Sequence, residues 1–373
     1  MGIQKLSPQQ WKAINSILLC RTPALGGELH GCPKCEYRQK RYHSCRNRHC
    51  PVCQGDAARK WIEKQKDKLL PVAYFHVVFS LPEELNPVFQ YNRSLLYNLF
   101  FQTGSETLQG FFEDPRHLGA KGGFFGVLHT WGQQMQFHPH IHWVVPAGGI
   151  NGKGQWVKPR RPDSEKFLFP VKALSEVFRG KFLEKLEKLY AKGKLSFPDP
   201  QSETGFRDRL SMAGAKKWNI YAKAPFAGPE QVIEYLARYT HRIAISPRRI
   251  KHVGEKTVTF EYKDYRAGGQ KKQSTVEGEL FLRRFVMHVL PRGFRKIRDY
   301  GWMRGEVIKP LRQRLLAWFA KQAEFARRLT GILCGSEEPD ACGTPACPKC
   351  EEGLLEFLRR LLPERIEASP GYG

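Results

Sequence analysis

Two stretches decide the expected fold: Phe124-Phe125-Gly126-Val127-Leu128-His129 and His138-Pro139-His140-Ile141-His142-Trp143-Val144-Val145. Both are short apolar runs with aromatic and β-branched residues, which is typical of strands. In the second stretch a histidine stands at every second position, so in a strand all three imidazoles leave on one face, each about 6.6 Å from the next. The pattern therefore predicts a strand with one histidine-lined face.

Adjacent histidines on this face can share a metal ion. The outer two would be about 13 Å apart, so a third ligand is expected from a neighbouring strand. His129 is the first candidate if the chain reverses between Trp131 and Phe137, and Gln133 and Gln134 are alternates. A single histidine is more often polar packing, but three together on a core face would need a metal or a network for their ring nitrogens. The expected ligands of a catalytic divalent ion are His129, His140 and His142.

An open site of this kind leaves coordination positions for a phosphate oxygen, on which the ion acts as a Lewis acid. Imidazole ligation suits manganese, zinc, cobalt or nickel better than magnesium, whereas the abundance of magnesium favours that ion. We therefore expect Mg2+ or Mn2+ at the catalytic site.

Further runs continue the same pattern. A β-like run at Tyr74–Ser80 precedes a helical stretch from about Pro87 to Gln109, and Val258–Tyr262 predicts a hairpin that turns through Ala267–Gly269. Between Arg283 and Leu329 a mostly helical region carries thirteen Lys or Arg against three acidic residues, so one face is expected to pack and the other to be basic. Strands interleaved with helices on an antiparallel plan predict an α+β fold.

The composition indicates a polyanionic partner. The 373 residues include 61 Lys and Arg against 36 Asp and Glu, a formal net charge of +25, and 41% hydrophobic residues, enough to bury a core. Nucleic acid and an anionic membrane surface both fit this charge. Because no apolar run approaches ~20 residues and the start lacks a signal-peptide pattern, we expect no membrane partner and a soluble, cytoplasmic protein.

The ten cysteines form two clusters, which in a reducing cytosol indicate metal sites rather than disulfides. The first cluster repeats a CxxC pair, and each pair can occupy two corners of a tetrahedron. One structural zinc is therefore expected on Cys32, Cys35, Cys50 and Cys53. Cys45, His43 and His49 could replace one ligand or help to form a second site. Cys20 is expected to be a buried thiol.

The second cluster lies near the other end of the chain and predicts a second zinc on Cys334, Cys342, Cys347 and Cys350. Both metals would fold segments too short to bury a core of their own. Their basic loops are still expected to hold DNA, for example through Arg46 and Arg48.

The stretch Glu230–Arg242 predicts a helix that places Tyr235 and Tyr239 one turn apart on one face. The same spacing is also typical of an ordinary amphipathic helix. The tyrosines are therefore candidates for catalysis only because the sequence also predicts a histidine metal site. The tyrosine side chain has a pKa of about 10. As a nucleophile it therefore needs a metal ion or cations such as Arg238 and Arg242 to favour the phenolate.

Taken together, these residues resemble the HUH-type two-tyrosine rolling-circle transposases of bacterial insertion sequences, the insertion-sequence 91 group, where HUH denotes His, a bulky hydrophobic residue and His. Here that motif is His140-Ile141-His142. Some relatives in this group work with a single tyrosine, so the order of Tyr235 and Tyr239 stays open. The resemblance spans nearly the whole chain, through Ser44–Pro51, His76–Pro82, Leu128–Gly132, His138–His142, Tyr221–Lys223, Tyr235–Arg242 and Arg284–Gly301.

The resemblance implies an HUH endonuclease-like central antiparallel sheet with flanking helices, plus small N-terminal and C-terminal zinc-binding modules. It also implies a transesterification that leaves a 5′-phosphotyrosine and a free 3′-OH during rolling-circle-like transposition. The partner would be single-stranded DNA, such as hairpin transposon ends and a target site, bound through phosphates and stacked bases. The resemblance also implies a bacterial protein that is associated with the nucleoid. The DNA-binding residues expected are Arg46, Arg48, Arg238, Arg242, Arg248 and Arg249.

Four parts are expected along the chain: an N-terminal zinc-binding, DNA-binding module (1–67), a catalytic domain with the tyrosine helix (68–275), a basic helical region (276–330) and a C-terminal Cys-rich zinc module with its tail (331–373). Three other functions stay open. They are an HUH replication initiator or relaxase, a non-catalytic zinc-stabilised DNA-binding regulator, and a hydrolytic metallonuclease.

Overall fold

A computed structural model of the chain describes residues 6–66, 68–159, 168–223, 244–304, 308–330, 348–350 and 355–363. It contains two compact units. Met1–Ala57 and Ala326–Gly373 form the first, here called the end unit, and Ala58–Phe325 form the second, the sheet unit. The four-part division stays a prediction, and in the structure the C-terminal segment groups with the N-terminal module. The physical reason is strand pairing between the two ends of the chain, described below.

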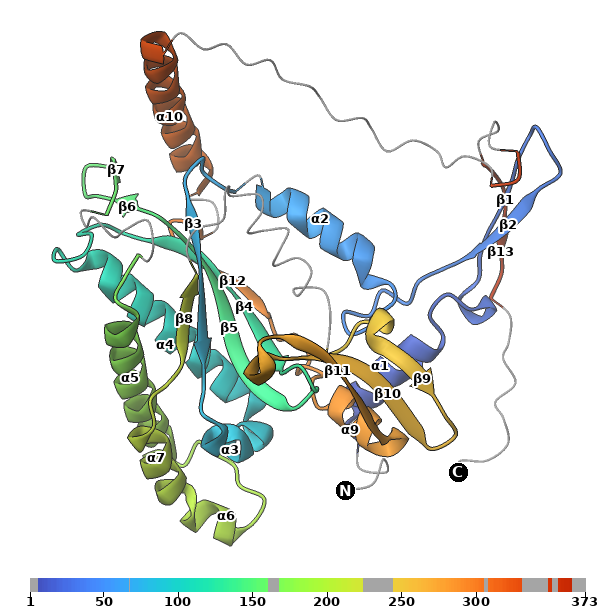
Figure 1. The fold of residues 1–373 in the computed structure, drawn as a ribbon, viewed down its shortest axis with the longest axis horizontal. Coiled ribbons are helices and arrows are strands. Elements are labelled where there is room, and N and C mark those ends of the chain that lie inside the picture. Colours follow the sequence, from blue (N-terminus) through green and yellow to red (C-terminus); the bar gives the residue numbers. More distant parts are fainter. Residues whose placement is uncertain are drawn as a thin grey trace. The chain divides into compact units, whose positions relative to one another are not determined.

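The sheet unit is built on a five-stranded sheet in the order β12-β4-β5-β3-β8 (Figure 1), and each neighbouring pair is antiparallel. This confirms the expected α+β fold with a central antiparallel sheet. Both stretches that opened the sequence analysis are central strands of it. The strands are β3 (Tyr74–Ser80), β4 (Gly123–Trp131), β5 (Phe137–Pro146), β8 (Ile220–Lys223) and β12 (Ile297–Gly301).

One face of this sheet carries the larger core. Side chains alternate between the two faces of a strand, so Ile141, Trp143 and Val145 of β5 leave on the side opposite to the histidines and join a buried apolar cluster. Helices contribute the rest of that cluster, including Phe100 and Phe178, which lie on two different helices. The helical elements of this region are η3 (Glu83–Leu85), α3 (Asn86–Tyr91), α4 (Arg93–Glu113), α5 (Val171–Ala191), α6 (Pro200–Thr204) and α7 (Phe206–Ala215).

The opposite face has a second, smaller core. Phe125, Val127 and Val144 pack there with Leu315 of α10 (Ile308–Thr330) and with Trp61 of α2 (Gln54–Lys66). Along β4 and β5 the histidines follow on this same face. The apolar part of the face thus fixes the strands that carry the histidines, while the histidine part is left for another role.

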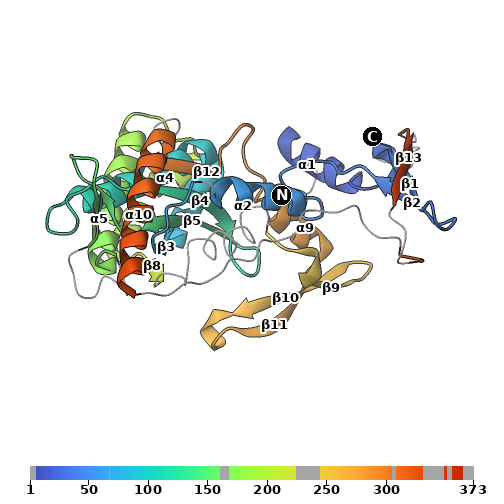
Figure 2. The same cartoon turned by 90° about the horizontal axis from the view of Figure 1, so that it is seen from above.

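A second sheet of order β11-β10-β9 lies in the same unit and projects away from the five-stranded sheet in Figure 2. β10 pairs with β11 from Thr257↔Glu277 to Asp264↔Gln270, which confirms the expected hairpin. Helix α9 follows it, and Phe281 of that helix packs on Phe260 of β10 with ring centroids 5.9 Å apart. The elements are η5 (Pro247–Arg249), β9 (Ile250–Val253), β10 (Thr257–Asp264), η6 (Tyr265–Ala267), β11 (Gln270–Glu277) and α9 (Gly278–Val286).

The region expected to be mostly helical, Arg283–Leu329, is helical at its two ends but contains an edge strand. That strand, β12, pairs with β4 from Ile297↔Val127 to Gly301↔Gly123. The sequence signal is weak because an edge strand is short and its side chains stay partly exposed, so Arg298 and Asp299 interrupt the apolar alternation. The helical expectation was wrong for these five residues.

The end unit contains a three-stranded antiparallel sheet of order β13-β1-β2. Its helix α1 begins at a capping box, in which Ser7 and Gln10 exchange side-chain to backbone hydrogen bonds. Two short strands of the sheet unit, β6 (Gly149–Ile150) and β7 (Trp156–Val157), pair with each other. The elements of the end unit are α1 (Pro8–Leu18), η2 (Pro23–Leu25), β1 (Gly27–Gly31), β2 (Arg38–Tyr42) and β13 (Glu356–Leu361). Among the described residues, no helix has the length and apolar character needed to cross a membrane.

Candidate active site

Three histidines meet on the sheet face opposite the larger core. His129 of β4 and His140 of β5 are direct cross-strand partners, and His142 lies two residues further along β5. One ring nitrogen of each lies within 4.8 Å of those of the other two. Strand pairing alone produces this geometry, because cross-strand neighbours and i, i+2 neighbours on one face are the closest side chains in a sheet. The structure thus brings together the three histidines that were predicted as ligands.

Hydrogen bonds at the Nδ1 atoms orient two of these rings. His140 Nδ1 lies 2.8 Å from the carbonyl oxygen of His138. Since a carbonyl oxygen only accepts, Nδ1 carries the proton and Nε2 has the lone pair. His142 Nδ1 lies 2.7 Å from Nε2 of His76, and the two rings are stacked at 5.0 Å. Such partners at the second ring nitrogen are typical of metal-binding histidines.

His76 is a site residue that sequence reasoning missed. It lies on β3 next to Val144 of β5 and is 3% exposed. Nothing in the local sequence marks it, since a lone histidine in an apolar strand is ordinary. Only the pairing of β3 with β5 places its ring beside His142.

The electrostatics of the cluster also fit a metal. Burial lowers the pKa of His140 to about 3 and, with the neighbouring imidazoles, lowers the pKa of His142 well below its ordinary value. Burial also lowers the pKa of His76 to about 4. At neutral pH the rings are therefore neutral, which is the form that ligates metal ions. Three imidazole nitrogens fit a divalent transition-metal ion such as Mn2+.

The histidines line a cavity of about 1010 Å³. Its walls come from β3, the end of β4, the turn at Gly132–Gln136, β5, the segment Ala244–Arg249 and the β10 hairpin up to Tyr265. Ala244 is the first described residue after 224–243, the range that holds the predicted tyrosine helix. Tyr235, Tyr239, Arg238 and Arg242 lie outside the described residues.

Gln133 and Gln134, the alternate ligands, both line this cavity. Their backbone carbonyls accept hydrogen bonds from Arg249 and Arg284. Arg249 also donates through Nε to the carbonyl oxygen of Glu261 at 2.7 Å, so its guanidinium braces the hairpin against the turn. Arg248, one residue earlier, is exposed. Of this predicted DNA-binding pair, Arg248 is the exposed one and Arg249 has a clear structural role.

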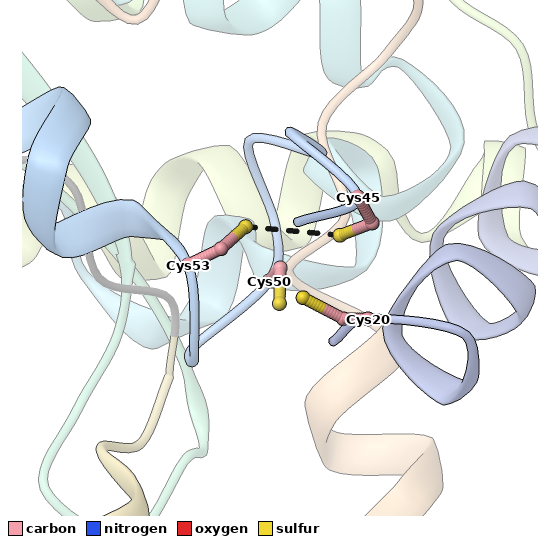
Figure 3. Close-up of side chains that lie close together, drawn as sticks. All are labelled: Cys20, Cys45, Cys50 and Cys53. Carbon is pink, nitrogen blue, oxygen red and sulfur yellow. Dashed lines mark hydrogen bonds between the residues drawn. The ribbon is translucent and has the colours of Figure 1, made fainter. Parts of the chain in front are cut away.

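The predicted zinc ligands group differently from the expectation. The structure gathers Cys50 and Cys53 with Cys45 and Cys20 (Figure 3), with all four sulfurs within 4.8 Å of one another. His43 and His49, the other alternates, are not members of this group. Cys20 was expected to be a separate buried thiol, and that expectation was wrong. The backbone explains it: Arg21 N donates to the carbonyl oxygen of His43 at 3.1 Å and so holds Cys20 beside the Cys45 loop.

Cys32 and Cys35 do not join that group, because they lie at the opposite end of a hairpin. β1 and β2 pair from Gly27↔Tyr42 at the base to Gly31↔Arg38 at the tip. A five-residue strand spans roughly 16 Å, too far for thiols at its two ends to share one ion. The structure instead places Cys32 and Cys35 with Cys350. The expected grouping of Cys350 with Cys334, Cys342 and Cys347 stays a prediction, because those three residues lie outside the described residues.

The four-thiol group fits a structural zinc. Cys45 Sγ and Cys53 Sγ are 3.7 Å apart, and a tetrahedral site with Zn–S bonds of about 2.3 Å separates its sulfurs by about 3.8 Å. Burial raises the pKa of Cys50 to about 11, and raises that of Cys45 far above its ordinary range. A divalent cation would hold these groups as thiolates. Arg46, which is exposed, and Arg48, which is half-buried, lie on the loop between these ligands.

Fold and site together define an α+β protein with a three-histidine centre in an open cavity and separate thiol clusters. Residues 123–309 match the family model described as "Putative transposase", and residues 2–81 match the one described as "Transposase zinc-binding domain". The chain belongs to the insertion-sequence 91 family of transposases, which confirms the resemblance seen in the sequence.

Two relatives illustrate the match. The chain is 47% identical over 305 residues to "Putative transposase y4qJ" of Sinorhizobium fredii (strain NBRC 101917 / NGR234), covering 80% of this chain and 75% of that protein. It is 29% identical over 310 residues to "Transposase for insertion sequence element IS801" of Pseudomonas savastanoi pv. phaseolicola, covering 79% of this chain and 70% of that protein.

Solved structures of the conjugative relaxase TrwC are also similar. A complex with a 27-mer DNA that comprises the recognition hairpin and the cleavage site matches at a TM-score of 0.27 and 14% identity, over 57% of this chain and 71% of that one. A metal-bound complex with oriT DNA matches at a TM-score of 0.25 and 15% identity, over 44% of this chain and 70% of that one.

Proposed function

We propose that this chain is an HUH-type transposase that nicks and rejoins single-stranded bacterial DNA by tyrosine transesterification. The observation that carries the proposal is the convergence of His129, His140 and His142 on one wall of an open cavity. Membership of a transposase family supports a DNA substrate, and the net charge of +25 supports binding to phosphates.

The chemistry needs a cation and a nucleophile. A divalent ion held by the three imidazoles would polarise the scissile phosphate as a Lewis acid. The orientation of His140 and His142 by their Nδ1 partners leaves both Nε2 atoms for such an ion. We keep Mg2+ or Mn2+ as the proposed catalytic ion and zinc as the structural one.

The proposed nucleophile is Tyr235 or Tyr239. Its phenolate oxygen would attack phosphorus, the bond from phosphorus to the 3′ oxygen would break, and that oxygen would leave as a 3′-OH after gaining a proton. The 5′-phosphotyrosine keeps the energy of the broken bond, so the strand can be rejoined to a new end without ATP. A second tyrosine would let two strand ends be held together during transfer between transposon ends and a target.

Residues around the cavity suit a single strand. Lys263 is exposed at the cavity wall, and so is the aromatic ring of Tyr265. Arg248, which is exposed, precedes the cavity-lining Arg249 in the chain. Cations that follow the backbone and rings that stack on bases are the two components of single-strand binding. Arg46, Arg48, Arg238, Arg242 and Arg249 remain proposed DNA contacts.

The test is formation of a covalent adduct. Protein is incubated with Mn2+ or Mg2+ and labelled single-stranded DNA from the ends of its own element, and DNA-linked protein is scored on a denaturing gel. We expect an adduct that His140→Ala and His142→Ala reduce by about 100-fold or more, because the phosphate loses its Lewis acid. His117→Gln, outside the cavity, is the matched control. Tight binding with no adduct under any metal would instead indicate a DNA-binding regulator.

The tyrosines need their own arm of the test. Tyr235→Phe and Tyr239→Phe remove the phenol oxygen and keep the ring. Loss of the adduct in one variant or in both would identify the nucleophile and its order. Cleavage that persists without an adduct in the double variant would indicate a metallonuclease and contradict the proposal.

A further inference from the structure

The cysteine cluster at the tip of the β1–β2 hairpin contains residues from the two ends of the chain. Cys32 Sγ and Cys350 Sγ are 3.7 Å apart although 318 positions separate them in the sequence. Together with Cys35 they lie within 4.8 Å of one another. Tetrahedral zinc thiolates place their sulfurs about 3.8 Å apart, so the three positions already have the spacing of ligands.

Strand pairing brings the start of β13 to the same end of the hairpin. β13 runs antiparallel to β1 with Gly31 opposite Glu356 and Gly27 opposite Leu361. In an antiparallel pair, the chain that leads into Glu356 approaches from the side of the residues that follow Gly31, which are Cys32 to Cys35. The register of β1 and β13 is therefore consistent with the place of Cys350 beside Cys32 and Cys35.

The sequence of β1 is adapted to this neighbour. A Cβ atom on Gly31 would lie 2.6 Å from Cδ1 of Leu358, and one on Gly26, whose φ is +65°, would lie 2.7 Å from the carbonyl oxygen of Leu361. Leu355, just before β13, is 3% exposed. The close approach of β13 is thus built into the glycines of the N-terminal strand and its preceding turn.

Apolar burial in this unit is small. Among its described residues, the buried hydrophobic side chains are Ala13, Leu29, Cys50, Cys53 and Leu355. Five of the six β13 residues are exposed. Small modules with so little core usually depend on metal ions or other cross-links. A cross-link between β1 and the segment before β13 would stabilise this sheet.

We propose that Cys32, Cys35 and Cys350 bind one structural zinc ion, distinct from that of the Cys20 group, and that this ion fastens the C-terminal segment to the N-terminal hairpin. The N-terminal zinc-binding module is then incomplete without the C-terminal end of the chain.

The count of thiolate-bound zinc in the full-length protein tests this. Zinc released by a thiol-specific organomercurial is measured with a colorimetric chelator, so that metal on the histidines does not contribute. We expect two zinc ions per chain in the wild type and one in Cys32→Ser, in Cys350→Ser and in Cys45→Ser. The double variant Cys32→Ser/Cys350→Ser should still hold one, whereas Cys45→Ser/Cys350→Ser should hold none. Loss of both ions from Cys32→Ser/Cys350→Ser would place the two residues in separate sites and overturn the proposal.

A measurement on the unchanged protein covers the case in which these variants do not fold. Zinc is removed with a chelator, the protein is oxidised mildly, and disulfide-linked peptides are identified by mass spectrometry. We expect linkage of Cys32 or Cys35 to Cys350, since their sulfurs lie within reach, and no such linkage while zinc is bound. Linkage of Cys350 only to Cys334 or Cys342 would contradict a zinc site that Cys350 shares with Cys32 and Cys35.

Discussion

At the scale of single residues, the site depends on side chains that touch the ligands as much as on the ligands. His76 contacts Nδ1 of His142 and leaves Nε2 of that ring for the ion. Partners of this kind hold the ring in position and set its tautomer. His76 is thus a positioning residue rather than a catalytic one.

We expect His76→Ala to weaken metal binding by about 10- to 100-fold, because His142 loses the partner that orients it. The measurement is the Mn2+ concentration that gives half-maximal adduct formation, with the yield at saturating Mn2+ near that of the wild type. His76→Gln, which can still accept from Nδ1, should recover part of the affinity. An unchanged metal dependence in His76→Ala would remove His76 from the site.

A second prediction concerns pH and His288. This residue is 1% exposed, lies near Thr130 Oγ1 and the carbonyl oxygen of Met135, and burial lowers its pKa to about 4. An unfolded histidine has a pKa of about 6.5. At a pH between these two pKa values, the unfolded chain therefore binds a proton at His288 that the folded chain does not bind. The stability that the folded chain gains from neutral His288 is fully present above about pH 6.5, and it is lost as the pH falls towards 4.

We therefore expect the free energy of unfolding of the wild type to fall more steeply between pH 6.5 and 4 than that of His288→Gln, by up to about 3 kcal/mol in total. Urea unfolding at a series of pH values measures both slopes. Equal slopes would mean that His288 titrates alike in the folded and unfolded chain.

At the scale of elements, the packing of α4 on β5 depends on a helical glycine. A Cβ atom on Gly104 would lie 2.7 Å from Cζ2 of Trp143, whose side chain is fully buried. The helix thus approaches the sheet at the point where the largest side chain of β5 needs room. Gly180 of α5 is the opposite case, with nothing within 4 Å of such an atom.

We expect opposite effects from the same substitution at these two glycines. Gly180→Ala should stabilise the protein by up to about 1 kcal/mol, because alanine favours helix over glycine. Gly104→Ala should destabilise it by about 1 to 3 kcal/mol, since overpacking against Trp143 outweighs that gain. Urea unfolding midpoints measure both. Stabilisation by Gly104→Ala would show that Trp143 can shift at little cost.

At the scale of the whole molecule, charge dominates. With a net charge of +25, binding of single-stranded DNA is expected to release counterions from the phosphates. For about five contacted phosphates, a fourfold rise in salt should weaken binding by roughly 100-fold. Fluorescence anisotropy of a labelled strand between low and moderate salt measures the slope. An affinity that hardly changes with salt would contradict binding through phosphates.

The sequence predicted much of the fold and of the histidine centre because both depend on short-range spacing. The alternation of β5 was enough to place His140 and His142 on one face, and the strand before it supplied His129. The zinc ligands were less predictable. Their CxxC pairs were recognised, but which pairs share an ion depends on how the hairpin between them is folded.

The α+β class, the family and the residue types of each centre could be predicted from the sequence, because strand periodicity and CxxC spacing act within a few residues. Four contacts became visible only in the folded chain: Cys20 with Cys50, Cys350 with Cys32, His76 with His142, and β12 with the edge of the sheet. In each case the two partners are brought together by strand pairing or backbone contacts between segments distant in the chain. No local pattern records such pairing, since its free energy comes from contacts that exist only once the chain has folded.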